Sequence, residues 1–188
     1  MGKQLWKPGN MLYPLPVVMV SLADRDGRPN IITLAWVGTV CTNPPMVSIS
    51  VRPERYSYPI LKEAGEFVIN LTTKELAFAT DYCGVKSGKD LNKFEEMHLT
   101  PEMGMLSWAP MIKESPVCIA CEVVRIEELG SHDMFLAKVT AVQVDESLLD
   151  EKGKLDLNKA HLVAYSHGEY QTFDNILGTF GYSVKKKK

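Results

Sequence analysis

Within the stretch SVRPERYSYP, residues 50–59, five residues place two guanidinium groups and three hydroxyl groups close together in the chain. They lie where an apolar run gives way to a helix-like segment, and they belong to Ser50, Arg52, Arg55, Tyr56 and Ser57. The first N–H groups of a helix have no partner within it and carry a partial positive charge, which suits a phosphate. Arginine adds a two-pronged donor. The stretch therefore indicates either an anion-binding corner or an ordinary surface turn.

A second unusual stretch is TLAWVGTVCTNPP, residues 33–45, which begins like a β-strand. It mixes the small residues Ala35, Gly38 and Cys41 with the large Trp36. Small side chains in a strand give up packing, and glycine weakens the strand unless another group must approach the backbone closely. The composition therefore predicts a strand cleared for such an approach.

Three further motifs have the letters of catalytic or metal sites without the required spacing. The glycines of GVKSGKD (84–90) are too close for a nucleotide-binding phosphate loop, and Asp90 replaces the magnesium-binding Ser or Thr. The adjacent residues of Ser131-His132-Asp133 cannot converge as a hydrolytic triad. Cys118 and Cys121 lie in a predicted strand, where residues three apart point to opposite faces. The sequence thus favours none of these chemistries.

Two groups from these motifs keep alternative interpretations. Ser87, Lys89 and Lys93 either contact an anion or belong to a solvated basic loop. His132 is either a hairpin histidine or a donor aimed at a ligand.

The bulk composition limits the classes of partner. The chain has 188 residues, 45% of them hydrophobic, and a formal net charge of −2. Its one basic run, residues 185–188, is interpreted as a solvated tail, so we do not expect nucleic-acid binding. No apolar run approaches the ~20 residues that span a bilayer, and no secretory signal is present. We therefore expect one cytoplasmic domain, residues 1–188, with no membrane partner.

Strand-like stretches dominate the chain. The sequence predicts strands over 15–24, 28–37, 46–51 and 66–71 and a long pair flanking Gly130, with hairpins at Asp24-Arg25-Asp26-Gly27 and at Gly130. Because the strands follow one another too closely for crossover helices, they indicate an antiparallel barrel.

Helices are expected to be short insertions in this barrel. One is predicted from Ser57 to a stop at Gly65, and another is capped by Thr72 or Thr73 and stops at Gly84. Residues 84–112 are polar and then rich in Met, Pro and Gly, so we expect a long excursion that packs on the barrel.

The order of these segments resembles the flavin reductase-like family, and it is most similar to the flavoredoxin branch. The resemblance rests on the continuous stretch 29–71, on SGKDLNKF, on SHDMFLAKV and on HLVAYSHGEYQTF. It extends from about residue 12 to the end of the last segment, which is nearly the whole chain. It implies a mainly β fold, an antiparallel split β-barrel of Greek-key type with short helical insertions, which binds FMN as a homodimer.

The resemblance also assigns residues to the cofactor. It places one strand under the isoalloxazine ring, where small side chains at Ala35 and Gly38 would admit the ring, and it places Ser50–Ser57 and Lys93 at the phosphate and His132 near the flavin. The implied FMN-binding residues are Asn30, Thr33, Leu34, Ala35, Trp36, Ser50, Arg52, Arg55, Tyr56, Ser57, Lys93 and His132. No catalytic acid, base, nucleophile or metal ligand is assigned.

Three functions are compatible with this assignment. The first is a flavoprotein that transfers electrons through bound FMN, for which the protein supplies binding and tuning. The second is an NAD(P)H-dependent flavin reductase with flavin as a diffusible substrate. The flavin reductases that act with monooxygenases commonly show Gly-Asp-His before this strand, where this chain has Gly130-Ser131-His132-Asp133, and this departs from the reductase pattern. The third is a non-catalytic split-barrel module that holds a ligand.

Overall fold

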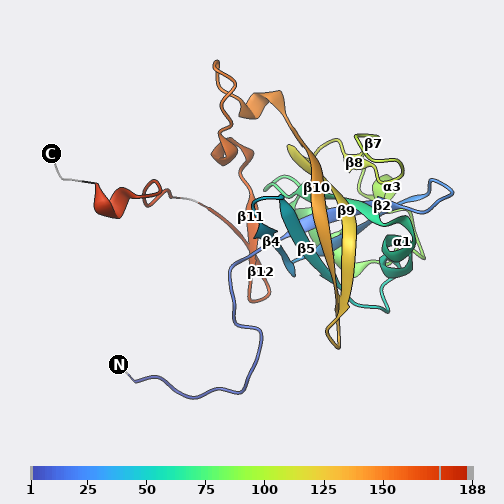
Figure 1. Ribbon diagram of the computed structural model, residues 1–188, viewed down its shortest axis with the longest axis horizontal. Coiled ribbons are helices and arrows are strands. Elements are labelled where there is room, and N and C mark those ends of the chain that lie inside the picture. The colour runs from blue at the N-terminus through green and yellow to red at the C-terminus, as the bar shows by residue number, and fades with distance from the viewer. Residues whose placement is uncertain (1, 174, 186–188) are drawn as a thin grey trace.

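The protein is built around one curled antiparallel sheet, seen in the computed structural model of Figure 1, which describes residues 2–173 and 175–185. In sheet order, the strands are β3 (Pro29–Leu34), β2 (Val18–Ala23), β6 (Glu66–Leu71), β9 (Val117–Glu128), β10 (Asp133–Val144), β5 (Met46–Val51) and β4 (Val37–Cys41). The mainly β, split-barrel fold predicted from the sequence is confirmed.

Smaller elements surround this sheet. A three-stranded sheet contains β1 (Leu15–Pro16), β11 (Val163–Ser166) and β12 (Glu169–Thr172), and a small ribbon contains β7 (Pro101–Glu102) and β8 (Met111–Ile112). The α-helices are α1 (Ser57–Ala64), α2 (Ala77–Val85) and α3 (Lys93–Glu96), and the 3-10 helices are η1 (Glu146–Leu148), η2 (Leu157–Ala160) and η3 (Tyr182–Val184). Among the described residues, no helix is long and apolar enough to cross a membrane.

The barrel is split between two consecutive strands. β3 and β4 follow one another in the chain, yet they form opposite edges of the sheet. The prediction of one continuous strand through Val37 is wrong, because the chain bends at Ala35 and Trp36. The Trp36 carbonyl accepts a hydrogen bond from the Ser50 N–H at 2.9 Å, which holds the bend against the end of β5. The small Ala35 and the large Trp36, noted in the sequence, therefore lie at the point where the barrel is split.

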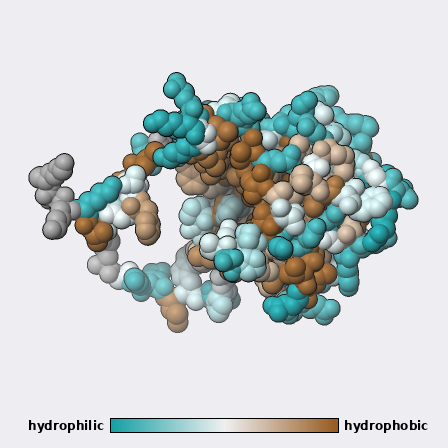
Figure 2. Space-filling model, turned by 45° about the horizontal axis from the view of Figure 1, so that its top comes forward, coloured by the Kyte–Doolittle hydropathy of each residue, from teal (hydrophilic) through white to brown (hydrophobic). Residues whose placement is uncertain are grey.

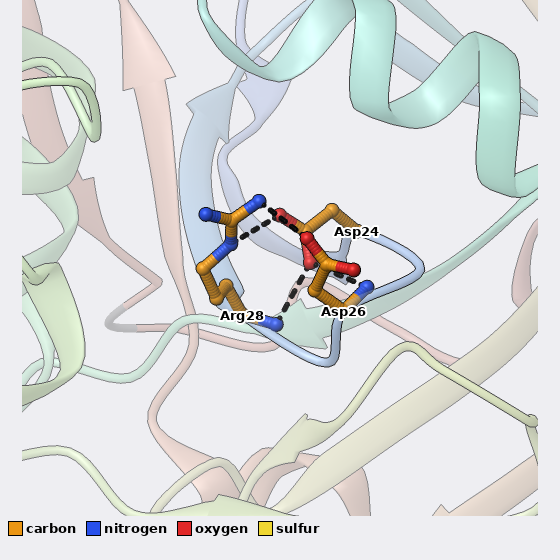
Figure 3. A network of polar contacts seen from close by, with 3 residues as sticks. All are labelled: Asp24, Asp26 and Arg28. Atoms are coloured by element: carbon orange, nitrogen blue, oxygen red, sulfur yellow. Dashed lines mark hydrogen bonds and ion pairs between the residues drawn. The ribbon is translucent and has the colours of Figure 1, made fainter.

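The β2–β3 hairpin is fixed by a turn that the sequence predicted. Asp24 accepts hydrogen bonds from the N–H groups of Asp26 and Arg28, and the Arg28 guanidinium bonds both carboxylates (Figure 3). Gly27 has a φ of 79°, which few other residues adopt easily. The turn sets the register that pairs Asn30 with Leu22 and Thr33 with Met19.

Both faces of the central strands are covered, and this explains their continuous apolar runs. On β2, Val18, Val20 and Leu22 pack in the interior core with Phe67 and Phe135, while Met19 packs in a separate core with residues of α2 and α3. Residues 17–23 of the run are therefore buried on both sides. The run is, however, two strands rather than one, with a break at residue 17.

The predicted hairpin at Gly130 is confirmed as β9–β10. Cys118 and Cys121 point to different cores, so the expectation that their thiols diverge is confirmed. Burial raises the pKa of the Cys118 thiol to about 11 and that of Cys121 to about 12. Both thiols are therefore small apolar side chains of the interior.

The excursion after residue 84 packs on the outside of the sheet, as predicted. Leu106 and Ala109 cover Val68 and Ala120, and the buried Glu66 carboxylate accepts hydrogen bonds from the N–H groups of this segment. This carboxylate therefore clamps the segment to the barrel.

The second helix differs from its prediction. Thr73 accepts a hydrogen bond from the Leu76 N–H, as a cap would, but α2 begins only at Ala77. Gly84 lies inside the helix and does not end it. A β-carbon at Gly84 would come within 3.2 Å of the Thr33 β-carbon, so glycine allows α2 to lie against β3. By contrast, α1 (Ser57–Ala64) begins and stops as predicted, with Gly65 as its C-cap at a φ of 69°.

Of the predicted basic tail, residues 186–188 lie outside the described residues.

Candidate functional site

A cleft of about 490 Å³ opens at the split in the barrel. The bend after β3 forms one side, and the ends of β5 and of the β9–β10 hairpin approach from another. Eight residues predicted from the sequence line it: Thr33, Leu34, Ala35, Trp36, Ser50, Arg52, Arg55 and His132. The structure thus brings together three segments that are far apart in the chain.

Aromatic rings form part of the cleft wall. The rings of Trp36 and His132 are nearly parallel, with an interplanar angle of 2° and centroids 6.1 Å apart. Partial burial lowers the pKa of His132, and the Arg52 guanidinium lowers it further. The imidazole is therefore mainly neutral at neutral pH, and it can form uncharged hydrogen bonds with a ligand in the cleft.

The Ser131-His132-Asp133 motif does not form a triad, but the expectation that none of its side chains meet is wrong, because Ser131 Oγ lies 2.9 Å from His132 Nδ1, within hydrogen-bond distance. Only Asp133 turns away. His132 faces Trp36, whereas the buried Asp133 carboxylate accepts a hydrogen bond from the Tyr58 hydroxyl. This bond raises the pKa of Tyr58. It ties the start of β10 to α1, and so it fixes His132 relative to the residues at the α1 N-terminus.

A small pocket of about 20 Å³ adjoins the cleft at this helix terminus. Ile32, Arg55 and Gly84 line both spaces, so the two are neighbours. The other residues lining the small pocket are Tyr56, Ser57, Cys83, Lys86, Gly88 and Lys93. Helix α1 has no acidic residue in its first turn and no side-chain cap. In its first turn, the Tyr58 N–H donates to the Arg55 carbonyl and Pro59 has no N–H, so the Ser57 N–H and the nearby cations provide donors for an anion.

The floor of this pocket requires glycine at position 88. The buried Asn30 side chain donates to the Ser57 hydroxyl at 2.9 Å. A β-carbon at Gly88 would lie 2.1 Å from the Asn30 amide oxygen. The loop backbone therefore approaches the Asn30–Ser57 pair closely, and any side chain at position 88 would displace it.

Lys93 is buried and not part of a solvated loop. Its ammonium group donates to the carbonyls of Ile31 and Cys83, each at 2.7 Å. Burial lowers the pKa of Lys93 to about 8, and the Arg55 charge contributes to the shift. Because an ammonium group has three donors, one is left for an anion in the pocket.

Some predicted residues have other places or partners. Asn30 lines neither space and acts through Ser57, and the Thr33 hydroxyl donates to the Thr80 carbonyl. Arg52 forms an exposed ion pair with Glu54 at 3.4 Å. Gly38 does not line the cleft: it borders a neighbouring groove, and a β-carbon there would meet nothing within 4 Å. The role of Gly38 in admitting a ring therefore stays a prediction.

The sequence did not single out the residues of the remaining wall. Asp81, Gly84 and Val85 come from α2, and Tyr165 and Tyr170 come from the β11–β12 hairpin. A signal for this hairpin exists, because His167-Gly168 forms a two-residue turn with φ values of 50° and 93°. Such turns connect hairpin strands, and glycine is common in them.

The geometry suits a ligand with a flat ring and an anionic group. The cleft offers a broad, partly aromatic wall, and the adjoining pocket offers cationic and amide donors. Among the described residues, no group of three or more His, Cys, Asp or Glu side chains could hold a metal ion.

Comparisons with known proteins agree with this arrangement. Residues 10–174 match the model of the flavin reductase like domain. The structure is similar to a flavoredoxin of Desulfovibrio vulgaris (Miyazaki F), with a TM-score of 0.90 and 33% identity over 98% of this chain and 100% of that one. A flavoredoxin from Methanosarcina acetivorans gives a TM-score of 0.87 and 29% identity over the same shares.

Some curated relatives carry enzymatic names. A flavin reductase of Pseudomonas putida is 26% identical over 145 residues, which are 75% of this chain and 81% of that protein. Its match, the two flavoredoxin structures and the domain model agree on a flavin-related redox function. The chain belongs to the flavin reductase-like family.

Proposed function

We propose that this protein binds FMN in the cleft at the barrel split and carries out electron transfer through it. The observation that carries the proposal is the pairing of a broad cleft with a cationic pocket at the α1 N-terminus. A phosphate fits that pocket's donors, and a flat ring fits the wall around Ala35 and Trp36.

The chain's residues would divide the work of binding. Arg55, Lys93 and the Ser57 N–H would hold the phosphate, and the Ser57 hydroxyl is kept in place by Asn30. β3 is an edge strand of the large sheet and, among the described residues, pairs only with β2. Every second N–H group of β3 therefore points away from β2 and can face a ligand. Bound FMN would supply the redox chemistry.

The second candidate is an NAD(P)H-dependent reductase that releases its flavin, and the Pseudomonas putida relative favours it. Gel filtration of the FMN-loaded protein, followed by an absorbance spectrum, separates the two. We expect flavin absorbance to elute with the protein. Elution of all flavin in the small-molecule fraction, together with NAD(P)H-dependent flavin reduction, would establish the second candidate. Failure of flavin to bind on titration would contradict both.

FMN affinity should fall at alkaline pH because of Lys93. Its pKa of about 8 in the free protein means that binding a phosphate dianion above that pH requires proton uptake. We expect affinity to be nearly constant just below this pKa and to fall as pH rises above it. Riboflavin, which lacks the phosphate, is the matched control and should show no such fall from pH 8 to 9. If the affinities for FMN and riboflavin changed with pH in the same way, Lys93 would not contact the phosphate.

The same shift predicts a change in stability of the ligand-free protein. The folded state lowers the pKa of Lys93 below its ordinary value of 10.5, so the unfolded chain binds more protons between about pH 8 and 10.5. The contribution of Lys93 therefore makes the free energy of unfolding rise with pH over that window.

We further propose that the protein is a homodimer. The terminal segments leave the barrel on one side (Figure 1) and expose large apolar side chains, among them Leu12, Leu177 and Phe180. Figure 2 shows further apolar surface on the body beside the hollow next to these segments. Exposed apolar surface of this kind marks interfaces, and twofold dimers are the commonest soluble assemblies.

Light scattering should therefore return about twice the chain mass of 21.0 kDa at micromolar concentration. Removal of the residues after Phe173 should shift the protein towards monomer, because it removes Leu177 and Phe180. A full-length protein with the mass of one chain would contradict the proposal. In the Met-rich segment 96–111, Leu106 and Ala109 pack on the chain's own sheet, while Met103 and Met105 remain exposed.

A further inference from the structure

One wall of the cleft is not used by the proposed flavin contacts. It is formed by Asp81 of α2 and by Tyr165 and Tyr170 of the β11–β12 hairpin. The Tyr170 hydroxyl donates to an Asp81 carboxylate oxygen at 3.0 Å. This bond joins two segments 89 residues apart in the sequence, so the hairpin and the helix form one continuous wall.

The aromatic part of this wall is held by backbone pairing. Tyr165 pairs with Leu15 of β1 on one side and with Tyr170 of β12 on the other. The rings of Tyr165 and Tyr170 are 5.9 Å apart at 64°, and the Tyr13 ring is 6.2 Å from that of Tyr165. Because sheet pairing and neighbouring rings fix both tyrosines, the wall is organised before a ligand arrives.

The charge of this wall is opposite to that of the phosphate pocket. Burial raises the pKa of Tyr170 to about 12, and its bond to Asp81 contributes, so Tyr170 remains a neutral donor. The charged side chains that line the cleft are then Arg52 and Arg55 near α1, and Asp81 at the tyrosine wall. A carboxylate beside aromatic rings favours a flat ring that is neutral or positive, and it disfavours an anion.

We propose that Asp81, Tyr165 and Tyr170 form a second binding subsite, which takes a flat aromatic ring that is neutral or positively charged. Ring binding itself does not require the flavin. The role of the subsite rests on the proposed function, under which the ring belongs to the molecule that exchanges electrons with bound flavin. The subsite would select that molecule by the charge on its ring.

Three probes of nearly equal shape test the subsite: benzamidine, benzamide and benzoate, which are positive, neutral and negative at neutral pH. Each is titrated into ¹⁵N-labelled protein, first without flavin and then with saturating FMN. We expect the amide signals of Asp81, Tyr165 and Tyr170 to shift. Benzamidine should bind about threefold more tightly than benzamide, a factor typical of one exposed ion pair, here with Asp81, and benzoate should bind most weakly.

Variants separate charge from shape. Asp81→Asn should abolish the preference for benzamidine over benzamide, whereas Glu151→Gln, which removes an exposed carboxylate outside the cleft, should preserve it. Tyr170→Ala should weaken all three probes together, with unchanged dispersion of the amide spectrum showing that the barrel remains folded.

Several outcomes would overturn the subsite. Benzoate binding as tightly as benzamidine would refute the charge selection, and an unchanged preference in Asp81→Asn would remove Asp81 from it. Displacement of the probes by FMN would show that this wall is part of the FMN-binding site and not a second subsite. If the probes bind in the expected order while FMN does not bind at all, the subsite stands and the proposed function fails.

Discussion

Ala35→Leu should give a folded protein that no longer binds FMN. Ala35 lines the cleft at the bend between β3 and β4, where the side chain is half-buried. Under the proposed function, a planar ring lies against the backbone there, so a branched side chain would occupy the ring's space. We expect FMN affinity to fall by about a hundredfold or more, which corresponds to about 3 kcal/mol. A fluorescence titration with FMN measures the loss.

The alternative explanation of Ala35 is that the core has no room for a larger residue. In that case Ala35→Leu would lower stability by about 1–3 kcal/mol through overpacking and leave FMN binding little changed. Thermal melting of the flavin-free variant distinguishes the two. Gly38→Ala is the matched control, because this position lies outside the cleft and has open space for a β-carbon. A variant at position 35 that binds FMN normally would show that the bend is not a ring site.

FMN should bind at least about tenfold more tightly than riboflavin, because only FMN carries the phosphate. Hydrogen bonds to charged groups contribute about 1.5–3 kcal/mol each, and the pocket offers several donors. Arg55→Ala should remove most of this difference by weakening FMN and leaving riboflavin nearly unchanged. Isothermal titration with both ligands gives the two affinities.

The control for this variant is Arg125→Ala, which removes an exposed guanidinium paired with Glu127 on β9, away from the pocket. Its ratio of FMN to riboflavin affinity should match that of the unchanged protein. Equal affinities for FMN and riboflavin in the unchanged protein would sink the assignment of this pocket to a phosphate.

Local signals in the sequence predicted much of the fold. Asp24, Asp26 and Gly27 form the turn between β2 and β3, and Gly65 ends α1 in a left-handed conformation. In both cases the residues that determine the structure are close together in the chain. The eight predicted residues that line the cleft were reached through the family resemblance and the composition of two short stretches.

Long-range packing determined what the sequence did not predict. Gly84 reads as a helix stop, but its role depends on Thr33, a residue of β3 some fifty positions earlier. Lys93 reads as a basic loop residue, yet its ammonium group meets carbonyls from β3 and α2. Tyr170 joins the cleft only because β11 pairs with β1 near the start of the chain. None of these partners lies within a local window of sequence.

The most direct test of the account is to locate FMN on the protein by amide chemical shifts. On addition of FMN to ¹⁵N-labelled protein, we expect the largest shifts at Ala35 and Trp36 beside the split and at Ser57 in the phosphate pocket. Riboflavin should reproduce the first group and leave Ser57 nearly unmoved. Shifts confined to the apolar groove lined by Pro16, Leu71 and Val163, with Ala35 and Ser57 unaffected, would contradict the account.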